Sequence, residues 1–127
     1  RLLVEDPRKC FDFYVNLLGY EPLWDDGGNA YLSVKLPDEE GPAIAFFAKK
    51  DMSAYEGYED IGQQVKSDYV MITLSVEDLD SAYDELKTKG VAFMGEPRDT
   101  PDWYMRCVML RDPEGNLVEL SGPLKEA

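Results

Sequence analysis

The 127-residue sequence has no histidine, only two cysteines and half as many basic as acidic residues. Its 13 lysines and arginines stand against 26 aspartates and glutamates, which gives a formal net charge of -13. A field of this sign repels the phosphates of nucleic acids and anionic lipids. The sequence also has no apolar run near the ~18 residues that a membrane span needs. We therefore expect neither nucleic acid nor a membrane as a partner.

The two cysteines, Cys10 and Cys107, are too few for a disulfide framework, and we expect a cytoplasmic protein. Cys107 has no histidine to activate it as a nucleophile. No glycine-rich loop leads from a strand into a helix, so we do not expect a nucleotide as ligand. Because the chain opens at Arg1 directly in a strand pattern, we expect the residues that normally precede it to lie outside this sequence.

The chain contains an internal repeat. VEDPRKCFDFYVNLLGYEP at 4–22 recurs in outline as VEDLDSAYDELKTKGVAFMGEP at 76–97, with Val-Glu-Asp displaced by 72 residues. GPAIAFF at 41–47 likewise matches GNLVEL at 115–120. Each copy has the pattern of a strand, a helix and further strands. We predict module 1 at about 1–48, a linker at about 49–68 with room for a short helix, and module 2 at about 69–123.

The helices and strands have recognisable boundaries. Asp6 and Asp78 are predicted N-caps, and Gly19 and Gly90 are predicted to end the two helices. The turn-forming segments DDGGN at 25–29 and DPEGN at 112–116 separate pairs of strands. The predicted strands, besides one at the start of the chain, are about Pro22–Trp24, Tyr31–Leu36, Ala43–Ala48, Met71–Val76, Tyr104–Leu110 and Leu117–Ser121.

With FYVNLLGYEP early and LRDPEGNLVEL late, this repeated pattern resembles the vicinal oxygen chelate superfamily of glyoxalases, bleomycin-resistance proteins and extradiol dioxygenases. The resemblance covers essentially the whole chain as a single domain, 1–127. It implies an α+β fold in which two βαβββ modules form a curled mixed sheet around a cavity. It also implies a homodimer. Function varies widely within the superfamily, so the site has to indicate it.

The resemblance implies where a metal would bind in metal-dependent members. Glu119 matches the glutamate of the last strand, whereas Ala45 stands at the equivalent place in the first module and Met71 at the first-strand position of the second. The remaining ligand would precede Arg1. A methyl group cannot bind a cation, and a thioether suits zinc, nickel or magnesium poorly. Because a catalytic site needs about three protein ligands, we expect no metal and no other cofactor.

The expected pocket is built around Glu119. Strand alternation and the resemblance place apolar and small polar side chains on its face, and the structural alternative for each is an ordinary place in the core. Such a lining suits a small, flat or hydrophobic ligand. The candidate ligand-binding residues on the strands are Glu119, Leu117, Cys107, Met109, Met71, Thr73 and Phe47, with Ala45 and Ser75 beside them.

Three further residues are candidates at the edge of this pocket. Trp103, in PDWYMR at 101–106, lies at the entry to a strand, where many metal-free relatives carry a tryptophan, and Trp24 is a candidate to oppose it. Aromatic faces bind flat or cationic ligands, although both residues could simply cap sheet ends. Arg106 is a candidate either to neutralise Glu119 or to bind an anionic group.

Three functions remain open at this point. The first is a metal-free protein that binds a small aromatic or cationic compound for sequestration or resistance, which the acidity favours. The second is a metal-dependent lyase similar to lactoylglutathione lyase, or a dioxygenase. The third is a metal-free enzyme in which Glu119 acts as a general base, which would require burial to raise its pKa.

Overall fold

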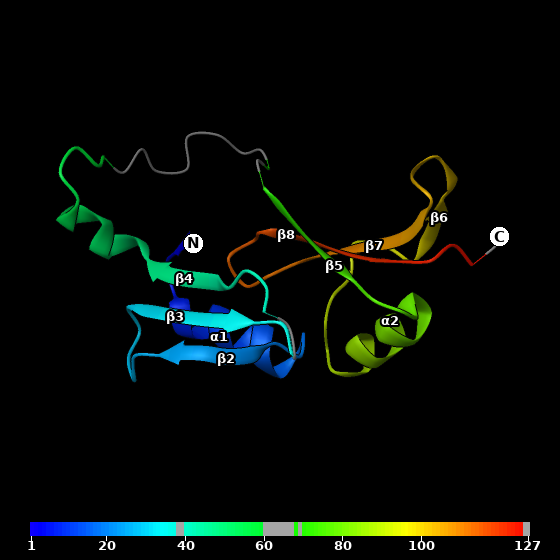
Figure 1. Ribbon diagram of the computed structural model, residues 1–127, viewed down its shortest axis with the longest axis horizontal. Helices are drawn as coiled ribbons and strands as arrows, with labels where there is room; N and C mark the ends of the chain where they lie inside the picture. The colour runs from blue at the N-terminus through cyan, green and yellow to red at the C-terminus, as the bar shows by residue number, and fades with distance from the viewer. Residues whose placement is uncertain (38–39, 60–67, 69, 126–127) are drawn as a thin grey trace. The chain divides into compact units, whose positions relative to one another are not determined.

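The structure is a computed structural model that describes residues 1–37, 40–59, 68 and 70–125. The chain divides into two compact units, Arg1–Ser67 and Asp68–Ala127. Each unit has a four-stranded mixed sheet and one α-helix (Figure 1). The predicted α+β class with two βαβββ modules is therefore confirmed, while the shared cavity stays a prediction.

In the first unit the strand order is β1-β4-β3-β2. β1 pairs in parallel with β4, and the other two pairings are antiparallel. The short helix expected after the first module is the 3₁₀ helix η1, and the rest of the predicted linker lies largely outside the described residues. The elements are β1 (Leu2–Val4), α1 (Pro7–Asn16), β2 (Glu21–Asp25), β3 (Tyr31–Lys35), β4 (Ile44–Ala48) and η1 (Lys49–Ala54).

The second unit repeats this arrangement in the order β5-β8-β7-β6. β5 pairs in parallel with β8, and β7 pairs with β8 and β6 in antiparallel fashion. The elements are β5 (Met71–Ser75), α2 (Leu79–Thr88), β6 (Arg98–Thr100), η2 (Pro101–Trp103), β7 (Met105–Arg111) and β8 (Leu117–Gly122). β6 and η2 were not predicted, and β7 begins one residue late because Tyr104 adopts a left-handed turn conformation with φ of 56°.

The two α-helices confirm the sequence repeat. Each has ten residues, and its N-cap carboxylate accepts a hydrogen bond of 3.1 Å from a backbone N–H, Asp6 from Lys9 and Asp78 from Ser81. Such caps satisfy donors that the first helical turn leaves unpaired. Gly19 and Gly90 follow the helices with φ of 78° and 93°, a region that favours glycine. None of the described helices is long and apolar enough to cross a membrane.

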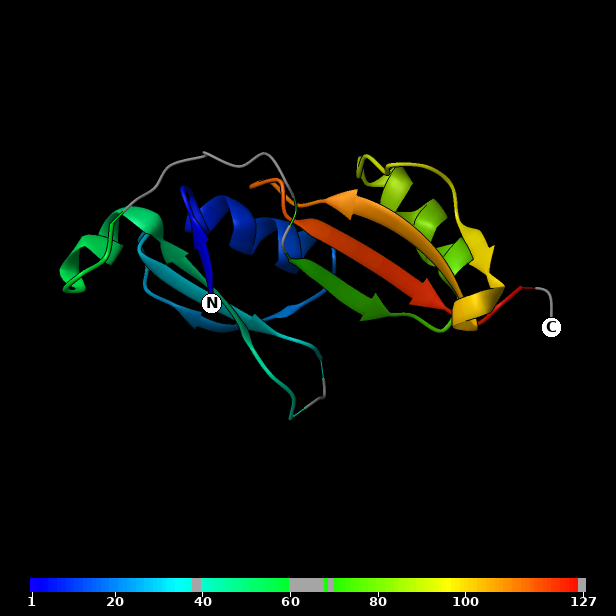
Figure 2. The ribbon, with the colours of Figure 1, turned by 90° about the horizontal axis from the view of Figure 1, so that it is seen from above.

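Each helix covers one face of its own sheet (Figure 2). In the first unit Tyr14 of α1 packs on Phe46 of β4, with ring centroids 5.0 Å apart, and both are fully buried. In the second unit the buried hydrophobic side chains of β7 and β8 share the face of Leu79 and Leu86 from α2, namely Val108, Leu110, Val118 and Leu120. We call the face of each sheet opposite its own helix the open face.

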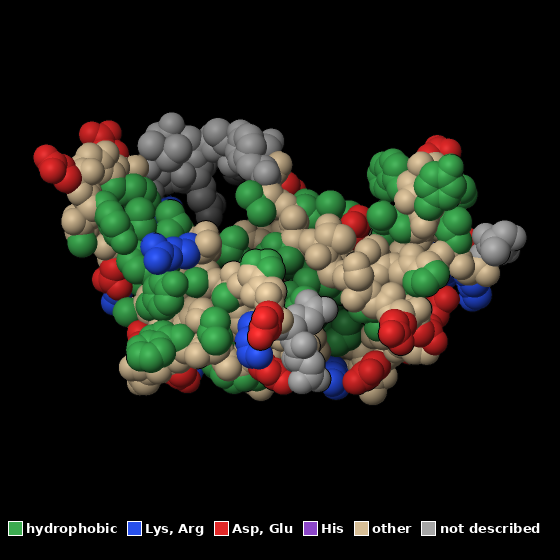
Figure 3. Space-filling view, in the orientation of Figure 1, with side chains coloured by type: hydrophobic (Ala, Val, Ile, Leu, Met, Phe, Trp, Pro, Cys, Tyr) green, Lys and Arg blue, Asp and Glu red, His purple; other side chains and the backbone are tan. Residues whose placement is uncertain are grey.

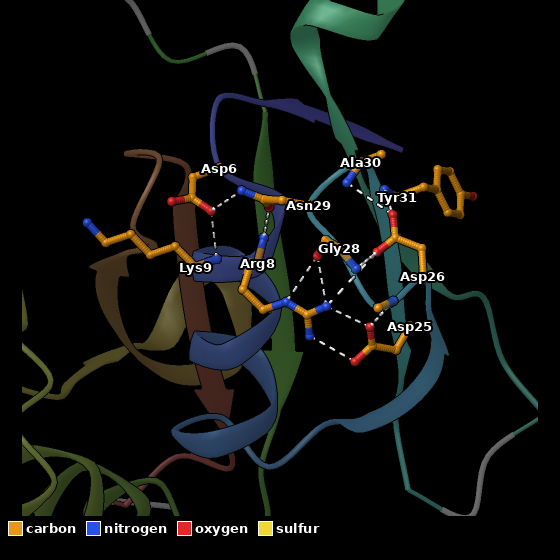
Figure 4. Close-up of polar contacts among 10 residues, drawn as sticks. Asp6, Arg8, Lys9, Asp25, Asp26, Gly28, Asn29, Ala30 and Tyr31 are labelled. Carbon is orange, nitrogen blue, oxygen red and sulfur yellow. Dashed lines mark hydrogen bonds and ion pairs between the residues drawn. The ribbon is translucent and has the colours of Figure 1, made fainter.

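The β2–β3 loop of the first unit is fastened to α1 through one arginine (Figure 4). Arg8 donates two hydrogen bonds to the carboxylate of Asp25, at 2.8 and 2.6 Å, and further bonds to the carbonyl of Gly28. Asp26 accepts from the backbone N–H groups of the same loop. Arg8 chiefly holds the pKa of Asp25 down, to about 2. The DDGGN segment is therefore an ordered, charged clasp on the helix.

Candidate ligand-binding site

Glu119 lies in the middle of β8 on the open face of the second sheet. It is 8% exposed, and its Oε1 accepts a hydrogen bond of 3.3 Å from the hydroxyl of Thr73 on β5. Within the part of the chain that the structure describes, Glu119 forms no ion pair. A carboxylate that is buried without a counter-charge is costly unless something binds it. The partner found is a neutral hydroxyl, and the guanidinium of Arg106 bonds elsewhere.

The strand register brings most of the predicted strand residues together. Glu119 pairs with Thr73 on one side and with Met109 on the other. The neighbouring rows on the same face hold Met71, Leu117 and Arg111, and then Ser75, Ser121 and Cys107. The expected sharing of one face by Glu119, Leu117, Cys107, Met109, Met71 and Thr73 therefore agrees with the pairing of β5, β8 and β7.

The turn before β8 fixes this register. Asp112 accepts hydrogen bonds of 2.9 Å from the backbone N–H groups of Glu114 and Asn116 and from the side-chain amide of Asn116. The N–H of Gly115 bonds to the Asp112 carbonyl at 2.9 Å. A one-residue slip would turn Glu119 to the helix-covered face. Most of the motif LRDPEGNLVEL thus serves the hairpin, and its glutamate is the residue presented to the site.

Arg106 does not belong to this site, which corrects the prediction that it might neutralise Glu119. Because side chains alternate along β7, Arg106 lies on the other face of the sheet from Cys107, the face that α2 covers. There its guanidinium bonds to Asp80 at 3.0 Å and to Asp99 at 3.2 Å. The hydrogen bond from Arg106 lowers the pKa of Asp80 and keeps that carboxylate ionised. Arg106 is committed to holding α2 against the sheet.

A hollow beside β7, which sequence reasoning missed, extends the open face. The backbone N–H of Met94 bonds to the carbonyl of Met109, and Arg98 pairs with Cys107. The chain therefore advances four residues, from 94 to 98, over a length that β7 covers in two. The two extra residues make residues 95–97 arch away from β7, as in a bulged edge. We call this segment the arch. Between it and β7 lies a hollow of about 410 Å³.

The residues around the hollow combine apolar and charged side chains. Met94, Cys107 and Met109 supply sulfur-containing walls, while Glu96 and Arg98 bring opposite charges. Met94 faces the open side because its neighbour Phe93 packs on Tyr83 of α2, with ring centroids 4.6 Å apart. The only sequence signal for this feature was the helix- and strand-breaking pair Gly95 and Pro97, since the charged triplet of β6 has no alternating pattern.

Trp103 stands at the far end of β6. It is 65% exposed in η2 and, with Thr100, Pro101 and Asp102, lines a smaller hollow of about 190 Å³. Thr100 lines the larger hollow as well. Hydrophobic side chains gather over this end of the second unit in the space-filling view (Figure 3). Trp103 is therefore presented for contact but is several residues along the sheet from Glu119.

The predicted residues of the first unit lie on the open face of its own sheet. Phe47 pairs with Tyr31, and their rings make an edge contact at 5.7 Å. Phe47 also lines a hollow of about 220 Å³ with Leu3, Met52 and Tyr55 among its walls. Trp24 of β2 pairs with Ser33 and is 59% exposed.

The donors in the two sheets do not fit a divalent metal. Leu2 pairs with Phe46 in the first sheet as Leu74 pairs with Leu120 in the second, which places Ala45 at the position of Glu119. Met71, at the start of β5, offers only a thioether. Among the described residues no group of three or more Cys, Asp or Glu side chains is arranged to hold a metal, and the sequence has no histidine.

The fold and site define a two-module α+β protein whose second sheet presents a buried glutamate. A family model described as Glyoxalase/Bleomycin resistance protein/Dioxygenase superfamily matches residues 1–120. The chain therefore belongs to this superfamily, and the resemblance inferred from its repeats and motifs is confirmed.

Individual relatives support the same placement. The chain is 32% identical to the uncharacterized protein YraH of Bacillus subtilis (strain 168), over 94% of this chain and 92% of YraH. It superposes with a TM-score of 0.77 on a glyoxalase/bleomycin resistance protein/dioxygenase from Nocardioides, at 23% identity over 99% of this chain and 82% of the other. For TnmS3, an antibiotic binding protein from Streptomyces sp. CB03234, the TM-score is 0.70, at 25% identity over 97% of this chain and 91% of TnmS3.

Proposed function

We propose that this protein binds a small aromatic, cationic compound without a metal, on the open face of the second sheet. The observation that carries the proposal is the state of Glu119, which is 8% exposed and, among the described residues, has only the Thr73 hydroxyl as side-chain partner. A cationic group would supply the missing counter-charge in a largely apolar setting, where ion pairs are screened less than at a free surface. The net charge of -13 would draw such a ligand toward the protein.

The surroundings of Glu119 suit an aromatic ligand. Met109 and Leu117 flank the carboxylate on the same face, and thioethers make favourable contacts with aromatic rings. The exposed indole of Trp103 adds a stacking surface at the end of β6. The similarity to TnmS3, an antibiotic binding protein, gives independent support for sequestration or resistance as the role.

The proposal also covers the cellular compartment and the oligomeric state of the protein. We propose a cytoplasmic protein, since Cys10 and Cys107 are free thiols rather than a disulfide. We also propose a homodimer, because isologous pairing is the commonest assembly and the superfamily resemblance implies it. Metal-dependent lyase or dioxygenase chemistry is not proposed, because the donor set does not fit.

Fluorescence tests the ligand class, because the chain has two tryptophans that can be separated. The Trp24→Phe variant leaves Trp103 as the reporter, and Trp103→Phe leaves Trp24. Titration with 1-methylquinolinium should change the Trp103 signal saturably, and rising salt should weaken binding. The neutral analogue 1-methylnaphthalene should bind less tightly and with little salt dependence.

Two variants assign the binding to named side chains. Trp103→Ala should weaken the binding of 1-methylquinolinium by on the order of 1 kcal/mol if the cation stacks on the indole. Glu119→Gln should weaken the binding of the cation more than the binding of the neutral analogue. If the neutral compound, or its sulfonate derivative, binds as well as the cation in the unmodified protein, the cationic ligand class is wrong.

A further inference from the structure

Arg98 is an exception among the arginines of this acidic chain. Arg8, Arg106 and Arg111 each form ion pairs with aspartates, and Arg1 lies over the ring of Tyr31. Arg98 is exposed, and in the described ranges its guanidinium has no hydrogen-bond or ion-pair partner. Acidic residues outnumber basic ones two to one, yet this guanidinium lines a hollow, with Glu96 on the same wall, and remains free to bind an anionic group.

The position of Arg98 relates it directly to Glu119. Arg98 of β6 pairs with Cys107 of β7. Met109, two residues further along β7 on the same face, pairs with Glu119 of β8. Two strand spacings across and two residues along put the Cα atoms of Arg98 and Glu119 about 12 Å apart. Their side chains share the open face, so the two charges flank the methionine-lined floor that joins Glu119 to the hollow.

We infer that the hollow under the arch is a subsite for an acidic group, and that the ligand is amphoteric, with an ammonium group at Glu119 and a carboxylate or similar anion at Arg98. This inference rests on the proposed function, which supplies the cation at Glu119. The aromatic body lies on the thioethers of Met94 and Met109 between the two charged ends. In the described structure neither Glu119 nor Arg98 forms an ion pair, and one amphoteric ligand would supply a counter-charge to both.

Matched one-ring probes test the inference. Benzylamine carries only the cation, 4-methylbenzoate only the anion, and 4-(aminomethyl)benzoate both. Binding is followed by NMR of protein labelled at the methionine methyl groups, which provides five reporters. Met94 and Met109 should shift on binding, whereas Met52, in the first unit, should not. 4-(Aminomethyl)benzoate should bind about three- to tenfold more tightly than benzylamine, as expected for an added charge-assisted contact.

Variants separate this inference from the proposed function. Arg98→Gln should abolish the advantage of 4-(aminomethyl)benzoate and leave benzylamine unchanged, and Arg98→Lys should keep most of the advantage. Lys89→Gln, which removes one charge beyond α2, should keep it in full. An advantage that is absent from the wild type, survives Arg98→Gln or is lost equally in Lys89→Gln overturns the inference. Failure of benzylamine to bind the wild type contradicts instead the proposed role of Glu119.

Discussion

Met109 lies directly across from Glu119 in the pairing of β7 with β8, and Thr73 lies across from it in the pairing with β5. The carboxylate is therefore set between a thioether and a hydroxyl, neither of which carries charge. This row of three side chains places a single charge in a largely apolar setting, which is the feature that the proposed binding of a cation uses. It also makes the carboxylate a cost to the folded protein when no ligand is present.

Glu119→Gln should separate stability from binding. Replacing the buried carboxylate by a neutral amide removes its desolvation cost, so the free energy of unfolding should stay equal or rise by on the order of 1 kcal/mol. Urea denaturation measures this, with the exposed Glu77→Gln as the control for loss of one negative charge. A clear fall in stability for Glu119→Gln alone would show that the carboxylate is structural.

The free energy of unfolding should fall in acid because the ion pair between Arg8 and Asp25 is lost. Arg8 is the main cause that lowers the pKa of Asp25 from 3.8 to about 2 in the folded protein. Because the folded pKa is the lower one, the unfolded state binds more protons between these values, and stabilisation present above pH ~4 is lost as pH falls toward 2. The unfolding free energy of Asp25→Asn should be lower at neutral pH and should fall less over that window.

Chemical denaturation at several pH values follows this loss. Asp84→Asn is the control, because Asp84 is exposed and its side chain forms no hydrogen bond or ion pair in the described structure. Its acid profile should match that of the wild type. If Asp25→Asn and the wild type lose stability in parallel from pH 4 to 2, the ion pair with Arg8 contributes nothing in solution.

No divalent metal should be retained by this chain. After dialysis against zinc, nickel or manganese and then metal-free buffer, elemental analysis should find far less than one ion per chain. Ala45 and Met71 at the ligand positions are the physical reason. Stoichiometric retention that Glu119→Gln abolishes would revive a metal-dependent enzyme, whereas retention unaffected by that change would indicate a surface site.

The protein should be a homodimer in solution. Light scattering on the eluting peak at micromolar concentration should give twice the chain mass of 14.4 kDa. A monomeric mass at that concentration would contradict the prediction.

Local signals in the sequence were sufficient for the helix starts and for alternation within a strand, whereas the strands that neighbour Glu119 were inferred from the superfamily resemblance. Asp6 and Asp78 cap helices because a short acidic side chain satisfies free N–H groups wherever a helix starts. Alternation then placed Leu117 with Glu119, because side chains in a strand change face at every residue, and the hairpin partner that the resemblance implies added Cys107 and Met109. Both rules act over a few neighbouring residues, and neither depends on the rest of the fold.

Long-range partners and edge segments were beyond such rules. One ion pair of Arg106 is with Asp80, which α2 brings to the same side of the sheet from 26 residues away. β6 is a three-residue edge strand without hydrophobic alternation, so apart from Gly95 and Pro97 nothing in the sequence marked it or the arch before it. That the Arg98 guanidinium lacks a partner in the described part of the chain could be recognised only after the other arginines had been assigned theirs.

The parallel pairings have a consequence for how the chain folds. Leu2 pairs with Phe46 and Leu74 with Leu120, so each parallel pairing closes within its own unit. Each such closure spans less than half of the chain, and the entropy that opposes loop closure grows only slowly with length. Either unit can therefore nucleate its sheet without waiting for a strand from the other, and the repeat in the sequence becomes a repeat in the folding pathway.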